Sequence, residues 1–136
     1  MDLVLDANIL IAALIKRGIT ADLIVDENIH LFAPEFIMDE FQKHRDEIVQ
    51  KIHRTKEDFE HFLEVIKQRT SFIPLEEIKP YLPQANAISP DPKDVAYIAL
   101  AIKTGASIWS NDKRLKDNQN KIPVLATHEI LGLLKP

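Results

Sequence analysis

Short apolar runs alternate along the chain with longer apolar or amphipathic stretches. The run at 3–5 is short and branched, and Asp6 separates it from a second apolar stretch at 7–15, which predicts a buried strand followed at once by a helix. Four more short runs predict strands, at 30–33, 72–75, 107–110 and 123–126. Helical patterns fill most of the intervals, and this alternation favours a parallel sheet covered on both faces. We therefore expect an α/β fold with three layers, α/β/α, around a sheet of about five parallel strands.

The segment 35–69 is predicted to be a helical hairpin inserted after the second strand. Apolar residues recur at helical spacing in its first half, and Thr55 begins a second helix whose apolar positions follow at i, i+3, i+4 and i+7. The segment 79–92 holds four prolines and is predicted to be mostly loop or turn. The run at 72–75 contains a proline, so we expect it at an edge of the sheet.

Several polar residues are predicted to begin helices. Thr20 and Thr127 each precede an apolar stretch and are expected to be N-caps. Asp91 is expected to cap the apolar helix that ends near Gly105, with Pro92 at its first position, where a proline is favoured. This assignment places Asp94 in the first turn of that helix.

Composition limits the function classes without selecting one. The 136 residues form a single domain, 1–136, by length, and 46% of them are hydrophobic. No cysteine is present, which excludes disulfides and thiolate metal sites. The N-terminus lacks a basic segment before an apolar stretch, and no apolar run approaches the ~20 residues that span a bilayer, so we expect a cytoplasmic protein. A net charge of −4 argues against a protein that coats DNA electrostatically, but not against an enzyme with a metal at its centre.

Four acidic residues are expected at one edge of the sheet. Asp6 follows the first strand, and Asp112 follows the strand at 107–110. Asp94 lies in the first turn of the apolar helix, and Glu40 lies in the first turns of the helix after the second strand. Since ligands bind outside the carboxyl ends of strands in open parallel sheets, all four are candidates for one site.

Each acid also has a purely structural interpretation. Asp6 is a suitable helix cap, and Glu40 lies one position off the apolar face of its helix, as a solvated residue does. Asp94 suits the positive end of a helix dipole, and Asp112 is a common turn residue. Taken together, however, close carboxylates repel one another unless a cation neutralises them. Oxygen ligands without cysteine or a histidine pair favour Mg²⁺ or Mn²⁺, which can promote attack on a phosphate.

Four fragments, in order and with the strand and helix pattern between them, resemble a known family. They are Leu-Asp-Ala-Asn-Ile-Leu at 5–10, Met-Asp-Glu-Phe at 38–41, Asp-Val-Ala-Tyr-Ile-Ala-Leu-Ala at 94–101 and Ser-Asn-Asp-Lys-Arg-Leu at 110–115. The chain resembles, over essentially its whole length, the PIN domain, which is the fold of VapC-type toxins and of several RNA-processing nucleases.

The resemblance assigns roles by position. Asp6 corresponds to the family's first metal-binding aspartate, and Glu40, rather than Asp39, to its glutamate. Asp94 corresponds to the acid that opens the alanine-rich helix, and Asp112 to the acid of the Ser/Thr-x-Asp turn. The resemblance thus implies that these four residues are both the metal ligands and the catalytic residues.

The resemblance also implies supporting residues and partners. Ser110 takes the hydroxyl position of the turn, Asn8 is expected to orient Asp6 or a bound water, and Asp91 is an additional acid near the site. A PIN domain implies Mg²⁺ or Mn²⁺ dependence, endoribonuclease activity on RNA and a homodimer. If the chain is the toxin of a toxin–antitoxin pair, an antitoxin protein is expected to cover the acidic edge. The length of the segment 35–69 and the proline-rich loop depart from the shortest toxin-like pattern.

Two further questions concern the substrate. Lys113 and Arg114 adjoin Asp112 and are the best candidates for phosphate contact, although most basic residues here are expected to be solvated. Trp109 lies in a predicted central strand and is interpreted as a core residue rather than a platform for base stacking. The alternative to a nuclease is a PIN fold that binds RNA or protein without cleaving it; the presence of all four acids argues against that alternative.

Overall fold

The computed structural model describes residues 1–135 and has one parallel sheet at its centre. Its strands lie in the order β3-β2-β1-β4-β5. They are β1 (Asp2–Leu5), β2 (His30–Pro34), β3 (Thr70–Ile73), β4 (Ser107–Trp109) and β5 (Val124–Leu125). All four neighbouring pairs are parallel, as the alternation of strands and helices predicted, and β3 lies at an edge, as its proline-containing run suggested.

Helices fill the connections between the strands. They are α1 (Ala7–Ile15), α2 (Ile19–Ile24), α3 (Phe36–Lys43), α4 (Arg45–Lys51), α5 (Lys56–Arg69), α6 (Leu75–Ile78), the 3₁₀ turn η1 (Lys79–Tyr81), α7 (Leu82–Ile88), the 3₁₀ turn η2 (Pro92–Asp94), α8 (Val95–Thr104), α9 (Lys113–Asp117) and α10 (Thr127–Leu134). No helix within residues 1–135 is long and apolar enough to cross a membrane.

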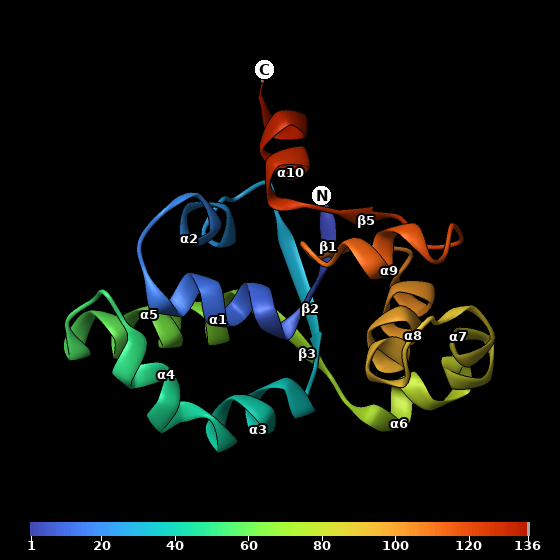
Figure 1. Cartoon of the computed structure of the whole chain (residues 1–136), viewed down its shortest axis with the longest axis horizontal. Coiled ribbons are helices and arrows are strands. Elements are labelled where there is room, and N and C mark those ends of the chain that lie inside the picture. The colour runs from blue at the N-terminus through green and yellow to red at the C-terminus, as the bar shows by residue number, and fades with distance from the viewer. Residues whose placement is uncertain (136) are drawn as a thin grey trace.

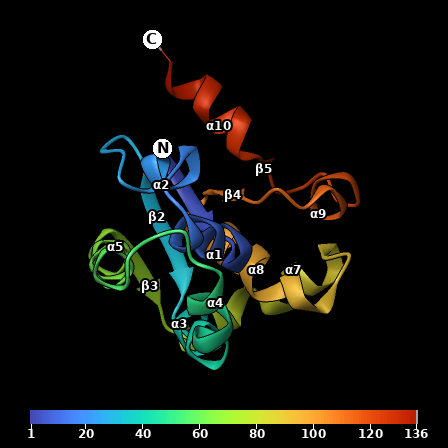
Figure 2. The same cartoon turned by 60° about the vertical axis from the view of Figure 1, so that its left-hand side comes forward.

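The helices form layers on the two faces of the sheet. Helix α8 packs against β1, β2 and β4, with α6 and α7 outside it. Helices α1 and α5 lie on the opposite face, and α2 and α4 contact α1 (Figures 1 and 2). Helix α10 extends away from this body, beyond the end of β5. The expected three-layer α/β/α fold is therefore confirmed.

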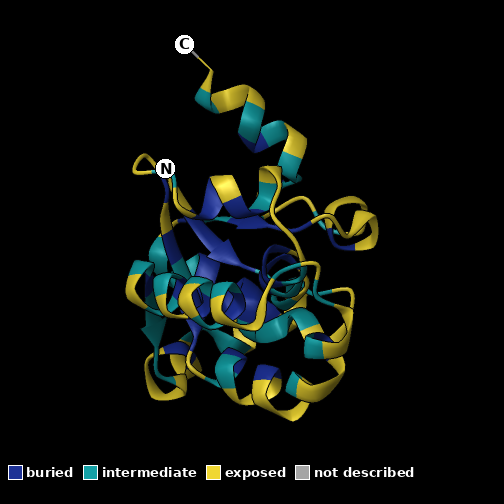
Figure 3. Cartoon of the chain, turned by 90° about the vertical axis from the view of Figure 1, so that its left-hand side faces the viewer, coloured by how far each residue is buried: buried dark blue, intermediate teal, exposed yellow. Residues whose placement is uncertain are grey.

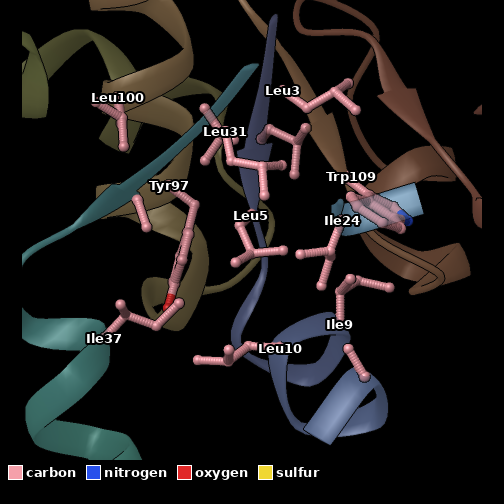
Figure 4. Packing of buried hydrophobic residues seen from close by; sticks show 14 of the residues in the cluster. Leu3, Leu5, Ile9, Leu10, Ile24, Leu31, Ile37, Tyr97, Leu100 and Trp109 are labelled. Atoms are coloured by element: carbon pink, nitrogen blue, oxygen red, sulfur yellow. The ribbon is translucent and has the colours of Figure 1, made fainter. Parts of the chain in front are cut away.

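The core lies between the sheet and these helices. The residues of β1 after Asp2 are at most 1% exposed, and Trp109 in β4 is fully buried, as expected of a core residue. Figure 3 shows the buried residues gathered in the central part of the sheet and the exposed residues on the outer faces of the helices. Figure 4 shows Leu5 of β1 packed between Ile24 of α2 and Tyr97 of α8. Because the central strands are buried on both faces, they are continuous apolar runs rather than alternating ones.

The strand order places a switch point beside β1. The chain builds β1, β2 and β3 outward in one direction and then returns to add β4 on the other side of β1. Leu5 pairs with Trp109, so the ends of β1 and β4 are in register. The residues that follow them, Asp6 and Ser110, are therefore neighbours at the carboxyl edge of the sheet, where open α/β sheets bind ligands.

The proline-rich segment differs from its prediction as a loop. Most of residues 75–94 is helical, in short pieces, and Pro80, Pro83 and Pro92 lie at the first or second position of η1, α7 and η2. Proline is tolerated there because those N–H groups have no partner within the helix. Each proline therefore begins a short helix instead of preventing one.

Other boundaries also shift. The predicted hairpin at 35–69 consists of three helices, because α3 and α4 meet at His44, whose backbone leaves the helical region. Thr55 does begin α5, and its hydroxyl accepts a hydrogen bond from the Asp58 N–H. The predicted caps Thr20 and Thr127 are wrong: Gly18 precedes α2, and Thr127 is the first residue of α10.

Candidate metal centre

An open pocket of about 920 Å³ lies at the carboxyl edge of the sheet, lined by the starts of α1 and α8 and one face of α3. All the acids singled out from the sequence line it. These are Asp6, Glu40, Asp91, Asp94 and Asp112. We call this the acidic pocket. The structure thus brings together residues that lie more than 100 positions apart in the sequence.

Ser110 connects two of these acids. Its hydroxyl donates a 2.7 Å hydrogen bond to Oδ2 of Asp6 and accepts one of 3.1 Å from the Asp112 N–H. Ser110 is only 2% exposed, so this bond is formed in partial isolation from water and is strengthened accordingly. The hydroxyl expected at this position therefore holds the end of β4 against the end of β1.

Asp6 is a helix cap and also a residue of the acidic pocket. It is the N-cap of α1, and its Oδ1 accepts a 3.3 Å hydrogen bond from the Asn8 N–H. It also lines the acidic pocket. Two donors fix its carboxylate, whose remaining lone pairs are available to a ligand. The Asn8 side chain is exposed and lines the same pocket, and it is the Asn8 backbone N–H that orients Asp6.

Asp94 is placed by the turn before it. Asp91 caps the 3₁₀ turn η2, and not the apolar helix as predicted, by accepting a 2.9 Å hydrogen bond from the Lys93 N–H; Asp94 ends that turn and is the N-cap of α8. Partial burial, together with the charges of Asp91, Asp112 and Asp6, raises the pKa of Asp94 to about 6. Carboxylate charge in this pocket is therefore poorly neutralised by the protein itself.

Asp112 is a helix cap rather than part of an open turn. Its Oδ1 accepts a 2.9 Å hydrogen bond from the Arg114 N–H, and α9 begins directly after it. Arg114 lines the pocket, and its positive charge partly offsets the rise in the pKa of Asp94. Lys113 is exposed and is not part of the pocket lining. Of the two basic residues predicted to contact phosphate, Arg114 is the better placed.

Glu40 stands apart from the other acids. It is exposed on α3 and lines the pocket, whereas Asp39 does not. The charges that raise the pKa of Asp94 are those of Asp91, Asp112 and Asp6, and Glu40 is not among them. The helix α3 therefore brings Glu40 to the rim of the pocket, facing a more closely grouped set of aspartates.

The donor set fits a hard divalent cation. The acidic side chains of the pocket offer oxygen ligands, the kind that Mg²⁺ and Mn²⁺ prefer. Within residues 1–135, no three Asp, Glu or His side chains are already close enough to hold a metal ion as they stand. Mutual repulsion keeps carboxylates apart until a cation neutralises them, and Mg²⁺ commonly uses only one or two of them together with water.

Several residues of the pocket were not predicted from the sequence. Tyr97 lies one turn after Asp94 on α8, and Phe36 lies one turn before Glu40 on α3. The signal was present, since residues three or four apart share one face of a helix. Both are aromatic residues within apolar segments, however, and this pattern is also typical of core residues.

Comparisons with known proteins agree with this fold. A sequence model of the PIN domain matches residues 4–127. Among solved structures, the chain is similar to a crystal structure of VapBC2 from Rickettsia felis, which is bound to a DNA fragment from the VapBC2 promoter. The two share 14% identity with a TM-score of 0.66, over 93% of this chain and 98% of that one, which shows a common fold. No curated protein matches the sequence. The match over most of its length shows that the chain belongs to the PIN domain family.

Proposed function

We propose that this protein is a metal-dependent nuclease that hydrolyses phosphodiester bonds of RNA at the acidic pocket. The observation that carries the proposal is the environment of Asp94. Its pKa is raised to about 6 by burial and by the charges of three aspartates, so the pocket holds negative charge that the protein does not balance. A group of carboxylates at a strand-end switch point that lacks its own counter-charge suits a site for divalent cations.

In this proposal Asp6, Glu40, Asp94 and Asp112 hold Mg²⁺ or Mn²⁺ and are the catalytic residues. A cation held by these residues would lower the pKa of a bound water and stabilise negative charge on the phosphate. Ser110 fixes the orientation of Asp6 through its 2.7 Å hydrogen bond.

Basic residues at the pocket would position the RNA backbone. Arg114 lines the pocket and presents a guanidinium that suits a phosphate oxygen, and Lys43 and Lys93 line it as well. Lys113 is a more distant candidate, in the solvent next to Asp112. Asn8 is available to contact a bound water at the start of α1.

The Asp94→Asn variant tests the proposal. We expect RNA cleavage to require Mg²⁺ or Mn²⁺, to stop with EDTA, and to fall at least about 100-fold in this variant, because one ligand is lost. Asp117→Asn is the matched control, since Asp117 is an exposed acid at the end of α9, outside the pocket lining. Circular dichroism checks that both variants are folded.

Two outcomes would contradict the proposal. Equal cleavage by Asp94→Asn and the wild type would exclude the acidic pocket as the catalytic site. Tight RNA binding with no cleavage under any divalent cation would instead favour the non-catalytic PIN-fold module.

We also propose that the chain is the toxin of a two-protein pair. The support is its likeness in fold to the VapBC2 structure over 93% of the chain. Induced expression is expected to arrest growth in the wild type but not in Asp94→Asn, and co-expression of a cognate antitoxin to relieve the arrest. Growth that continues at full rate with an active nuclease would contradict the toxin assignment.

We also propose that the chain forms the homodimer that the family resemblance implied. Light scattering of the purified chain tests it.

A further inference from the structure

The hydroxyl of Tyr97 is a buried polar group without a partner. Tyr97 is 8% exposed and lines the acidic pocket, yet its hydroxyl forms no hydrogen bond with any atom of residues 1–135. Buried polar groups are nearly always paired, because an unpaired one keeps its full desolvation penalty. An unpaired hydroxyl on a residue that lines the acidic pocket therefore indicates a partner that reaches it in another state of the site.

The position of this hydroxyl is well defined. The ring of Phe36 meets the Tyr97 ring edge to face, with 6.0 Å between centroids and 81° between planes. Figure 4 shows the Tyr97 ring extending from α8 so that its oxygen lies beside Ile37 of α3. Ile37 is 1% exposed, so the ring is held in a packed environment. The hydroxyl therefore faces the helix that carries Glu40.

Glu40 is the acid best suited to accept from this hydroxyl. Burial is the largest cause of the raised pKa of Tyr97. The negative charge of Glu40 is the second largest, ahead of the charges of Asp6 and Asp94. Asp6 is already held by two donors. Glu40 is exposed, and its carboxylate accepts no hydrogen bond from the part of the chain that the structure describes. It also follows Phe36 and Ile37 by one turn of α3, on the same side.

We propose that Tyr97 is a positioning residue for Glu40: its hydroxyl donates a hydrogen bond to the Glu40 carboxylate as that side chain turns into the pocket to meet the metal. The inference rests on the proposed metal site and adds the reason why an acid at the rim becomes a ligand. The phenol keeps its proton at neutral pH, since its pKa is raised by burial and by the Glu40 charge, so its O–H is available to donate to a carboxylate.

A double-mutant cycle on metal affinity tests this inference. Mn²⁺ binding is measured by calorimetry, without RNA, for the wild type, Tyr97→Phe, Glu40→Ala and the double variant. We expect Tyr97→Phe to weaken Mn²⁺ binding about 10-fold, as the loss of a group that orients a ligand does. In the Glu40→Ala background the same change is expected to leave the affinity unaltered, because the hydroxyl has no ligand left to orient.

Matched controls separate positioning from packing. Tyr81→Phe makes the same chemical change at the chain's other tyrosine, which lies outside the acidic pocket, and Asp39→Ala removes the acid next to Glu40. Neither is expected to alter Mn²⁺ affinity. Without metal, the denaturant midpoint of Tyr97→Phe should equal or exceed that of the wild type, because the deleted hydroxyl has no partner there.

Three results would overturn the inference. The first is unchanged Mn²⁺ affinity in Tyr97→Phe while the wild type binds the ion. The second is an equal loss with and without Glu40, which would show that Tyr97 acts independently of it. The third is a lower denaturant midpoint in metal-free Tyr97→Phe that accounts for the whole loss of affinity. A wild type that binds no Mn²⁺ is a different failure, since it refutes the proposed function on which the inference rests.

Discussion

The two ends of α1 carry groups of charged residues with opposite properties. At its start, Asp6 belongs to the acidic pocket, where aspartates face one another. At its end lies a group that we call the arginine cluster, made of Arg17, Arg54 and Asp58. The side chain of Arg54 is 3% exposed, and it donates to Asp58 at 2.8 Å and to the carbonyls of Ala13 and Lys16 at 2.9 and 3.2 Å.

The two groups differ in how their charge is balanced. In the arginine cluster, hydrogen bonds from Arg54 and then Arg17 hold the pKa of Asp58 below its usual value. In the acidic pocket, burial and neighbouring aspartates raise the pKa of Asp94 to about 6. Removing one member of a nearly buried ion pair destabilises the fold, whereas a group of like charges opposes folding until a ligand neutralises it. One helix thus joins a structural charge cluster to the proposed metal site, and variants of the two should respond differently.

Arg54→Ala should have the largest effect on stability. Arg54 also stacks on Phe62, with 4.5 Å from its guanidinium carbon to the ring centroid, and it satisfies carbonyls at the end of α1. Removing one partner of a nearly buried pair is expected to lower the free energy of unfolding by about 3 kcal/mol. Urea denaturation measures it. A loss below about 0.5 kcal/mol would show that the cluster is not what stabilises this end of the helix.

Binding of a divalent metal should have the next largest effect on stability. It is expected to act at the acidic pocket, at the start of α1. Mn²⁺ at about 100 times its dissociation constant is expected to stabilise the wild type by about 2.7 kcal/mol, because it binds only the folded state. The gain should persist in Arg54→Ala, provided that this variant folds, and should be small in Asp94→Asn. Thermal melts with Mn²⁺ or EDTA measure it. An equal gain in Asp94→Asn would place the ion outside the acidic pocket.

Asp94→Asn should stabilise the metal-free protein. The pKa of Asp94 is raised in the folded state, so its contribution to stability is fully present below about pH 4 and is lost as the pH rises through about 6. At neutral pH the neutral side chain is expected to raise the free energy of unfolding by about 1 kcal/mol or less, because water screens this partly exposed group. Urea denaturation at several pH values measures it, and a wild-type advantage above pH 6 would contradict it.

Arg17→Ala should have the smallest effect. Arg17 bonds Asp58 at 3.0 Å, but its side chain is 77% exposed. Exposed ion pairs contribute about 0–1 kcal/mol, so we expect a loss of stability that is small beside that of Arg54→Ala. The loss should decrease further in high salt, which the urea midpoints with and without added NaCl will show. If Arg17→Ala lost as much stability as Arg54→Ala, the difference in exposure between the two arginines would not explain their contributions to stability.

Local patterns predicted much of this fold and less of the site. The strand runs and the apolar helix ending at Gly105 were visible because apolar periodicity is set by burial, and Gly105 adopts the left-handed conformation at φ 73°. Each of the four predicted acids does line the pocket. The break at His44 was not visible, because the apolar spacing continues through it.

The interactions that organise the charged groups are tertiary. Arg54 meets carbonyls about 40 positions earlier in the chain, and no local spacing points to that contact. The unpaired state of the Tyr97 hydroxyl likewise depends on how α3 and α8 meet. The sequence identified which residues have the right chemistry, while the contacts between distant helices decide which of those residues act together.

The hydrogen bond from Ser110 to Asp6 spans 104 positions, and this has a consequence during synthesis. A growing chain emerges from the ribosome with its N-terminal end first, and contacts between distant residues form last. Asp6 is exposed to the cell early, but β4, Ser110 and Asp112 follow only when most of the chain has been translated. The acidic pocket therefore cannot assemble until β4, Ser110 and Asp112 have emerged, and every shorter nascent chain lacks the proposed metal site.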